Sequence, residues 1–158
     1  MNNPIKSFKD LDVYCNLYSA CIEVMTNIIP FLPVLEKYDL RDQLSRSCKA
    51  APRLVAEGYA KKHQKQGFQK YIDDAMAECN ECVVSLEQVK DIYHLEVERC
   101  EKLVDAYDKS ARQLFNLAIA WDKFKNRRFT PPLDDTPARH RLRLRRRQGG
   151  SSATPNTN

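Results

Sequence analysis

The chain has 158 residues, which is enough for one domain with a substantial core. It contains only 4 Gly, and its apolar residues fall in long tracts, so helices are favoured over a sheet. No tract approaches the roughly 18 consecutive apolar residues of a membrane-spanning helix, and the polar, acidic N-terminus leads us to expect no signal peptide. We therefore expect a cytoplasmic protein whose 6 Cys are reduced thiols rather than a disulfide framework.

The formal net charge of +5 hides a strong asymmetry along the chain. Residues 127–158 hold eight arginines and two aspartates, which gives +6, whereas residues 1–126 carry 18 basic and 19 acidic side chains. Within that body, residues 41–70 hold eight Lys/Arg against two acids, and residues 73–122 hold five against twelve. The two segments are therefore at +6 and −7, so opposite charges gather on different parts of the chain.

The first predicted helix begins at a capping box and ends at two prolines. Ser7, followed three residues later by Asp10, is a sequence signature of a helix N-terminus. Pro30 and Pro33 remove backbone donors and fix φ, so this helix should stop near Ile29. Apolar residues at alternating spacings of three and four predict its core-facing stripe: Leu11, Tyr14, Tyr18, Cys21, Met25 and Ile28.

The second predicted helix starts after Asp39, which we expect to be its N-cap. Asp42 then lies in the first turn, where a negative charge favours the helix dipole. Its stripe is weaker than the first because two of its positions are not apolar: Leu40, Leu44, Ser47, Ala51, Leu54 and Gly58.

The third and fourth predicted helices are each close to thirty residues long. Their stripes are Phe68, Ile72, Ala75, Cys79, Cys82, Leu86, Val89 and Tyr93, and then Val97, Cys100, Val104, Tyr107, Ala111, Leu114, Ala118 and Trp121. Continuing the third stripe would place Glu96 in the core, whereas the pattern resumes at Val97. We therefore predict a short break at residues 94–96, although the segment lacks Gly and Pro and the pattern also allows one continuous helix.

The fourth helix has more apolar surface than one antiparallel hairpin needs. Leu103, Leu117 and Phe124 lie beside its stripe, and Phe115 and Ile119 lie further round. Such a surface fits a central bundle helix and also fits a helix that makes subunit contacts, and the sequence leaves both open. Together the four stretches predict an all-α fold, an antiparallel up-down four-helix bundle over residues 1–126.

Residues 127–158 have the composition of a disordered basic tail. Four prolines, a Gly pair and a Ser/Thr/Asn-rich end offer too little apolar surface for a core. The middle of this segment contains six arginines within nine residues, 139–147.

The sequence offers no catalytic or metal-binding constellation. Cys79 and Cys82 form a CxxC, but both fall on the apolar stripe in mid-helix, where free cysteine packs as a small hydrophobe. His63, His94 and His140 lie in or next to predicted turns or the tail, and no nucleotide-binding or hydrolase motif occurs. We predict that the protein is not an enzyme and uses no metal or cofactor.

Basic side chains favour a binding function. Arg46, Lys49 and Arg53 follow the second stripe by two positions, about 200° round the helix, so they should project away from the core. Clustered cations are enough to bind a phosphate backbone, and an ordinary solvated face is the alternative. The predicted nucleic-acid-binding residues are Arg46, Lys49, Arg53, Lys61, Lys62, Lys65, Lys70, Arg139, Arg141, Arg143, Arg145, Arg146 and Arg147.

Three stretches carry a resemblance to a known family: SFKDLDVY at 7–14, LRDQLSRSCKAAPRLVAEGYAKK at 40–62 and GFQKYIDDAMAECNECVVSLEQVKDI at 67–92. The chain resembles the bacterial four-helix-bundle proteins encoded in intervening sequences of 23S ribosomal RNA genes. Those proteins are related to the accessory variability determinants of diversity-generating retroelements. The resemblance covers roughly residues 7–124, and its most specific element is AEGY at 56–59.

This resemblance implies a ring-shaped homopentamer that binds nucleic acid through basic surfaces. In the retroelement branch it implies a non-enzymatic partner of a reverse transcriptase and its template RNA. The chain departs from the family at Leu54, where Asn is common, and at Ala77-Glu78, where a Gly-Ser pair is usual. Its arginine-rich tail also extends past the usual end.

The leading hypothesis is a non-catalytic homo-oligomer that binds an RNA or DNA backbone, with RNA favoured and a reverse transcriptase as a further partner. No membrane is involved. The alternatives are a bundle protein encoded by an rRNA intervening sequence, or a protein–protein adaptor without direct nucleic-acid binding. A thiol or metal protein ranks last.

Overall fold

The computed structural model of the chain describes residues 4–64 and 66–128, and over 124–128 it describes the helical backbone alone. This part of the chain is all-α and contains no strand. The helices are α1 (Asp12–Asn27), α2 (Leu40–Ala60), α3 (Gly67–Tyr93) and α4 (Val97–Arg128), with 3-10 turns η1 (Phe8–Asp10), η2 (Ile29–Phe31) and η3 (Val34–Tyr38). The core described below lies in the unit that ends at Lys123.

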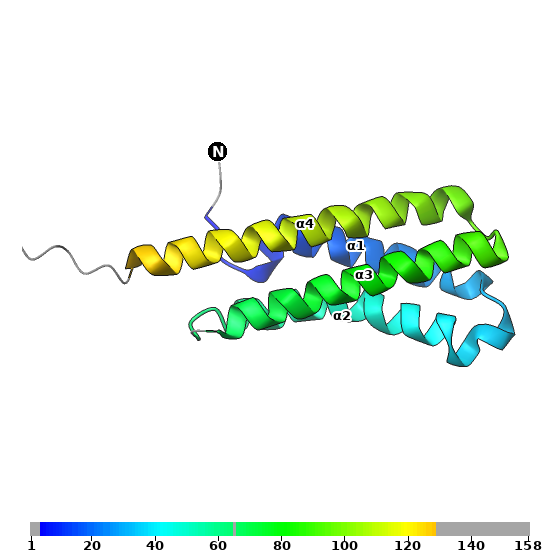
Figure 1. Ribbon diagram of the computed structural model, residues 1–158, viewed down its shortest axis with the longest axis horizontal. Helices are drawn as coiled ribbons and strands as arrows, with labels where there is room; N and C mark the ends of the chain where they lie inside the picture. The colour runs from blue at the N-terminus through cyan, green and yellow to red at the C-terminus, as the bar shows by residue number, and fades with distance from the viewer. Residues whose placement is uncertain (1–3, 65, 129–158) are drawn as a thin grey trace, which may run out of the picture. The chain divides into compact units, whose positions relative to one another are not determined.

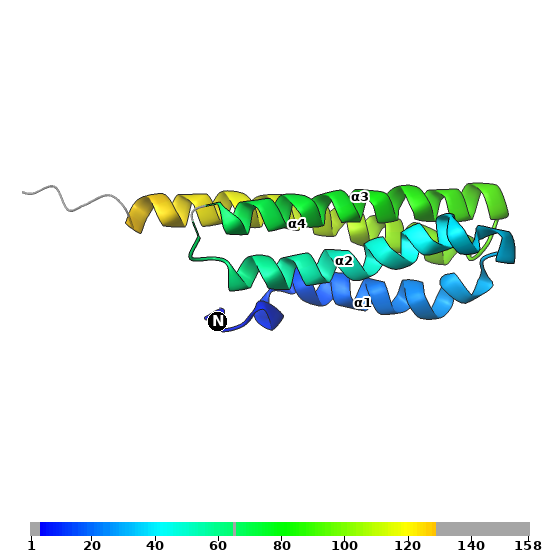
Figure 2. The same cartoon turned by 90° about the horizontal axis from the view of Figure 1, so that it is seen from below.

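Consecutive helices run in opposite directions, and α1 packs on α2 as α2 packs on α3 (Figures 1 and 2). Side chains also join the first helix to the last, since Asn16 Nδ2 donates to Gln113 Oε1 at 3.1 Å. Short connections between antiparallel neighbours are typical of an up-down bundle.

The stripes predicted for α2, α3 and α4 face the core except at Val97, which is 40% exposed at the start of α4. In α3 the predicted positions from Phe68 to Val89 are all buried, and Tyr93 packs against them. In α2 the stripe widens to include Cys48, Pro52 and Val55, and in α4 Leu103 joins it. The three–four spacing therefore identified the buried face of these helices correctly.

The stripe predicted for α1 is confirmed at Leu11, Cys21 and Ile28, which are buried, and is wrong at Tyr18. Tyr18 is 53% exposed, and Tyr14 and Met25 are only partly buried. The buried residues of this helix are Val13, Leu17, Ala20, Cys21 and Val24. Both faces of α1 are apolar, and the aliphatic face can enter the core without burying a phenolic hydroxyl that would need a hydrogen-bond partner.

The N-terminus of α2 is capped by a residue other than the predicted one. Asp39 occupies the cap position, but its backbone is not extended (φ −127°, ψ −108°) and its carboxylate makes no cap hydrogen bond. Glu36, one turn earlier, accepts from the Leu40 N–H at 3.1 Å instead. The capping box at Ser7 and Asp10 is present as predicted, although it caps η1 rather than α1.

The predicted break between the third and fourth helices is confirmed. His94 (φ 52°) and Glu96 (φ 44°) both adopt left-handed backbone conformations. The His94 N–H donates to the Lys90 carbonyl at 3.0 Å and closes the last turn of α3. Histidine enters this conformation more readily than most residues, so the chain turns here without glycine.

Gly58 lets α2 pack closely on α3. A Cβ added to Gly58 would lie 2.9 Å from the Tyr71 Cβ, closer than side chains normally pack. We expect Gly58→Val to lower the free energy of unfolding by about 1–3 kcal/mol, because the two helices must move apart. Valine is a better helix former than glycine, so the loss can only be steric.

Ala60→Val is the matched control for Gly58→Val, since Ala60 is exposed two residues along the same helix. It should cost only about 0.5 kcal/mol of helix propensity. Urea denaturation followed by circular dichroism measures both variants. Equal losses would show that Gly58 makes no tight contact.

Candidate nucleic-acid interface

Arg46, Lys49 and Arg53 form a row on α2, called here the α2 row. Arg46 and Arg53 are exposed and Lys49 is half-buried. Arg46 lies 3.8 Å from Asp42 in an i,i+4 pair, a solvent-exposed contact that contributes little. Lys49 and Arg53 form no ion pair with another described residue.

One side of the α2 row faces acidic side chains of α3. All three cations line a groove that also contains Glu78 and Glu81. Burial, with the neighbouring Glu81 carboxylate, raises the pKa of Glu78, and Arg46 opposes that rise. Charges of both signs therefore line this α2–α3 groove, which makes it unfavourable for a phosphate backbone.

The other side of the α2 row faces an aromatic groove between α1 and α2. Lys49 and Arg53 line this groove of about 380 Å³ together with Tyr14, Tyr18 and Ile22. No carboxylate lines it. The α1–α2 groove thus has two cations on one side and apolar and aromatic side chains on the other.

Two cations at the turn between α2 and α3 are engaged within the chain. The Lys61 ammonium donates to the Tyr71 hydroxyl and lies 4.3 Å from that ring centroid. The Lys62 ammonium lies 3.8 Å from the Tyr59 ring centroid, within cation–π range. A phosphate would compete with these contacts, so the two residues are weaker candidates than the α2 row.

The remaining predicted site residues divide into one that is exposed and others that lie outside the described residues. Lys70 is exposed on the first turn of α3. Lys65 and the tail arginines lie outside the described part of the chain: Arg139, Arg141, Arg143, Arg145, Arg146 and Arg147. Among the described residues, the three cations of the α2 row line one common groove.

The aromatic residues of the α1–α2 groove were not predicted as a site. Their i,i+4 spacing was interpreted as core, because the pattern treats tyrosine as any other apolar residue. The sequence does contain a second apolar face of α1, formed by Val13, Leu17 and Val24. Because this face carries no hydroxyl groups, it could have been recognised as the better candidate for the core, which would have left the tyrosines at the surface.

The CxxC cysteines pack in the core, as the sequence predicts. Cys79 and Cys82 are both fully buried. Burial raises the pKa of Cys79 to about 12, and burial likewise raises the pKa of Cys82, so both stay protonated near neutral pH. Within residues 4–64 and 66–128 no group of three His, Cys, Asp or Glu side chains is placed to hold a metal ion.

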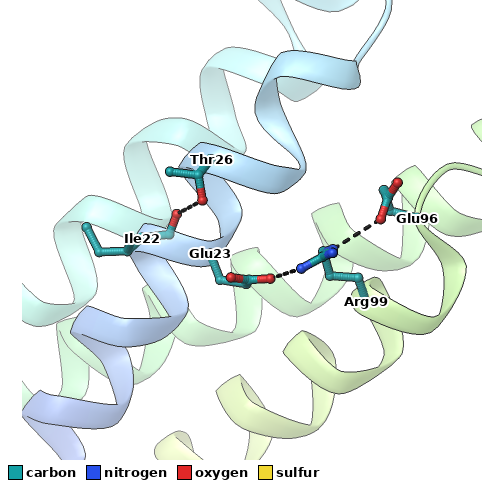
Figure 3. Close-up of polar contacts among 5 residues, drawn as sticks. All are labelled: Ile22, Glu23, Thr26, Glu96 and Arg99. Atoms are coloured by element: carbon teal, nitrogen blue, oxygen red, sulfur yellow. Dashed lines mark hydrogen bonds and ion pairs between the residues drawn. The ribbon is translucent and has the colours of Figure 1, made fainter.

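Arg99 of α4 forms ion pairs with Glu23 of α1 and with Glu96 (Figure 3). Its Nε donates to Glu96 at 3.1 Å, and its Nη1 forms an ion pair with Glu23 of α1. Hydrogen bonds to Glu96 and then to Glu23 raise the pKa of Arg99. These residues border a cleft of about 630 Å³ that Glu98 and Lys102 also line, so three carboxylates face two cations there and the cleft is unfavourable for a phosphate.

None of the described helices is long and apolar enough to cross a membrane.

The comparison with protein families identifies this chain. The model of the 23S rRNA-intervening sequence protein family matches residues 9–116, more than half of the chain. The chain belongs to that family. The matched range runs from η1 into α4 and includes the whole α2 row and every residue that lines the α1–α2 groove except Phe8.

The match confirms the resemblance to the intervening-sequence family, whose description names no reaction and no ligand. Neither the search of curated proteins nor that of solved structures gave a significant match. A role for this 23S rRNA-intervening sequence protein must therefore be argued from its own surface.

Proposed function

We propose that this 23S rRNA-intervening sequence protein is a non-enzymatic, oligomeric scaffold that binds the phosphate backbone of RNA along the α2 row. The observation that carries the proposal is the row itself. Arg46, Lys49 and Arg53 lie on one helix, and the last two form no ion pair within residues 4–64 and 66–128. Backbone binding requires clustered, accessible cations rather than a shaped pocket.

The absence of an assembled nucleophile and base supports a non-enzymatic role. Cys79 and Cys82 are buried thiols with a raised pKa. His63 and His94 are exposed at opposite ends of α3, so neither lies beside these thiols. Neither of these two histidines can therefore act as a general base for the CxxC thiols.

Uncovered apolar side chains support assembly into a homo-oligomer, for which the family resemblance suggests a pentamer. Four of them lie in the connection between α1 and α2 and are 58–84% exposed: Phe31, Val34, Leu35 and Tyr38. Phe115 and Ile119 of α4 are also exposed, at 56% and 39%. Apolar patches of this kind mark protein contacts more often than free surface.

The same apolar side chains favour a second candidate, an adaptor that docks another protein such as a reverse transcriptase. Arg46→Glu should then abolish partner binding and leave RNA affinity nearly intact. A reverse transcriptase gene with template repeats beside the reading frame would favour this candidate, whereas a surrounding ribosomal RNA gene would favour the intervening-sequence origin alone.

Neutralising two cations of the α2 row tests the backbone-binding proposal. We expect Lys49→Gln/Arg53→Gln to weaken binding to an oligouridylate and to reduce the slope of log K against log salt by about 1.4, or 0.7 for each lost phosphate contact. Fluorescence anisotropy at several salt concentrations measures the slope.

The matched control is Lys102→Gln/Lys109→Gln, which removes the same charge from exposed positions of α4. It should leave the slope nearly unchanged. If both double variants reduce the slope equally, the protein attracts RNA through its net charge and the α2 row is not the interface.

A further inference from the structure

We propose that the α1–α2 groove is a subsite for unpaired bases, in which Tyr18 stacks on a base while Lys49 and Arg53 hold the adjoining phosphates. This inference rests on the proposed function and narrows its ligand to single-stranded nucleic acid. It assigns a role to aromatic residues that backbone binding alone does not use.

The aromatic side of the groove is an ordered series of rings. Phe8 meets Tyr14 edge-on with centroids 4.8 Å apart, and Tyr14 lies nearly parallel to Tyr18 at 6.0 Å and 21°. Tyr18 ends the series and is 53% exposed. A base stacked on Tyr18 would extend this arrangement by one ring, which is how single-strand-binding proteins contact bases without reading sequence.

The cationic side of the groove lies on the neighbouring helix. Lys49 and Arg53 line the same groove as Tyr18 and have no carboxylate partner there. The charges of Lys49 and Arg53 also act on Cys21, which lines the groove. The hydrogen bond between Cys21 and Cys48, whose Sγ atoms are 3.9 Å apart, is the main cause that lowers the pKa of Cys21, and the two cations add to it against the effect of burial.

The distribution of acids decides which side of the α2 row a polyanion takes. On the α3 side, Glu78 and Glu81 would repel a phosphate. On the α1 side the lining consists of rings, aliphatic groups and the two cations. A nucleic-acid strand that contacts Lys49 and Arg53 is therefore directed over Tyr18.

The chemistry of the groove fits a single strand better than a duplex or an apolar partner. A duplex keeps the faces of its bases stacked inside, so it cannot present one to Tyr18. A purely apolar partner would cover Lys49 and Arg53 without pairing them, which is unfavourable. A single strand supplies both a π-face and phosphates at neighbouring positions.

The test uses the full-length protein and a dye-labelled oligouridylate, which remains single-stranded, beside an RNA duplex. We expect Tyr18→Ala to weaken oligouridylate binding by about five- to a hundredfold and to leave duplex binding unchanged. Tyr18→Phe should retain most of the affinity, since phenylalanine also stacks. Val84→Ala removes another exposed apolar side chain, which like that of Tyr18 is 53% exposed but lies on α3, and should have no effect.

Several outcomes would overturn the inference. Equal affinities of Tyr18→Ala and Val84→Ala for oligouridylate would exclude stacking on Tyr18. A changed sedimentation coefficient of Tyr18→Ala with unchanged RNA affinity would assign the groove to a protein contact. Circular dichroism of both variants checks folding, which an exposed side chain should not disturb.

The inference and the proposed function fail in distinguishable ways. If Lys49→Gln/Arg53→Gln weakens oligouridylate binding but Tyr18→Ala does not, the base subsite is wrong and backbone binding stands. If the unaltered protein binds neither oligouridylate nor duplex, both are wrong.

Discussion

Phe68→Ala is expected to lower the free energy of unfolding by about 3–5 kcal/mol, the typical cost of removing a buried aromatic ring. Phe68 is 2% exposed at the start of α3, and its ring centroid lies 4.7 Å from that of Trp121 in α4. The substitution would open a cavity between the two helices and remove this ring contact. Urea denaturation followed by circular dichroism measures the loss, and Trp121 fluorescence reports on the cavity.

Phe115→Ala is the control, because it removes the same ring from a position that is 56% exposed. It should change the free energy of unfolding of the monomer by less than about 1 kcal/mol. A loss for Phe115→Ala as large as that for Phe68→Ala would mean that Phe115 is covered in solution, as it would be in an oligomer. A small loss for Phe68→Ala would contradict the packing of α3 on α4.

Replacing the six arginines between residues 139 and 147 with glutamine should flatten the salt dependence of RNA binding. If each arginine neutralises one phosphate of a single strand, together they contribute a slope of log K against log salt near −4. Between 50 and 200 mM salt that contribution alone weakens binding by roughly 300-fold. Anisotropy titrations of the full-length protein and the variant at both salt concentrations measure the difference.

These arginines lie outside the described residues, so the prediction rests on composition and the counterion argument. Replacing six Ser, Thr or Asn residues elsewhere in residues 127–158 with glutamine is a control that keeps the charge. Identical slopes for the unaltered protein and the arginine variant would show that the tail does not contact RNA. The α2 row would then account for the binding alone.

The fourth helix shows how far local patterns predict the fold. Its break from α3 was predicted from a single misplaced acid, Glu96, and the structure has Glu96 and His94 in left-handed conformations there. Caps and breaks depend on a few neighbouring residues, so they can be deduced locally. The cap of α2 by Glu36 was missed because its carboxylate acts from a preceding turn that no pattern predicted.

The candidate site was predicted in part. The row of Arg46, Lys49 and Arg53 follows from helix periodicity alone, since residues on one face of one helix need no tertiary information. The sequence could not predict that Lys61 would contact Tyr71, because that contact depends on the path of the α2–α3 turn. It also could not predict which helix would border each side of the row.

The sequence by itself determined the four helices, the breaks between them and the cationic face of α2, because periodicity, caps and prolines act over a few residues. Only the tertiary structure decided which apolar face of α1 is buried. Val13, Leu17 and Val24 entered the core, and Tyr18 was left beside Lys49 and Arg53. Both faces of α1 are apolar, so packing against its neighbouring helices decides which of them is buried, and the other face forms one wall of the α1–α2 groove.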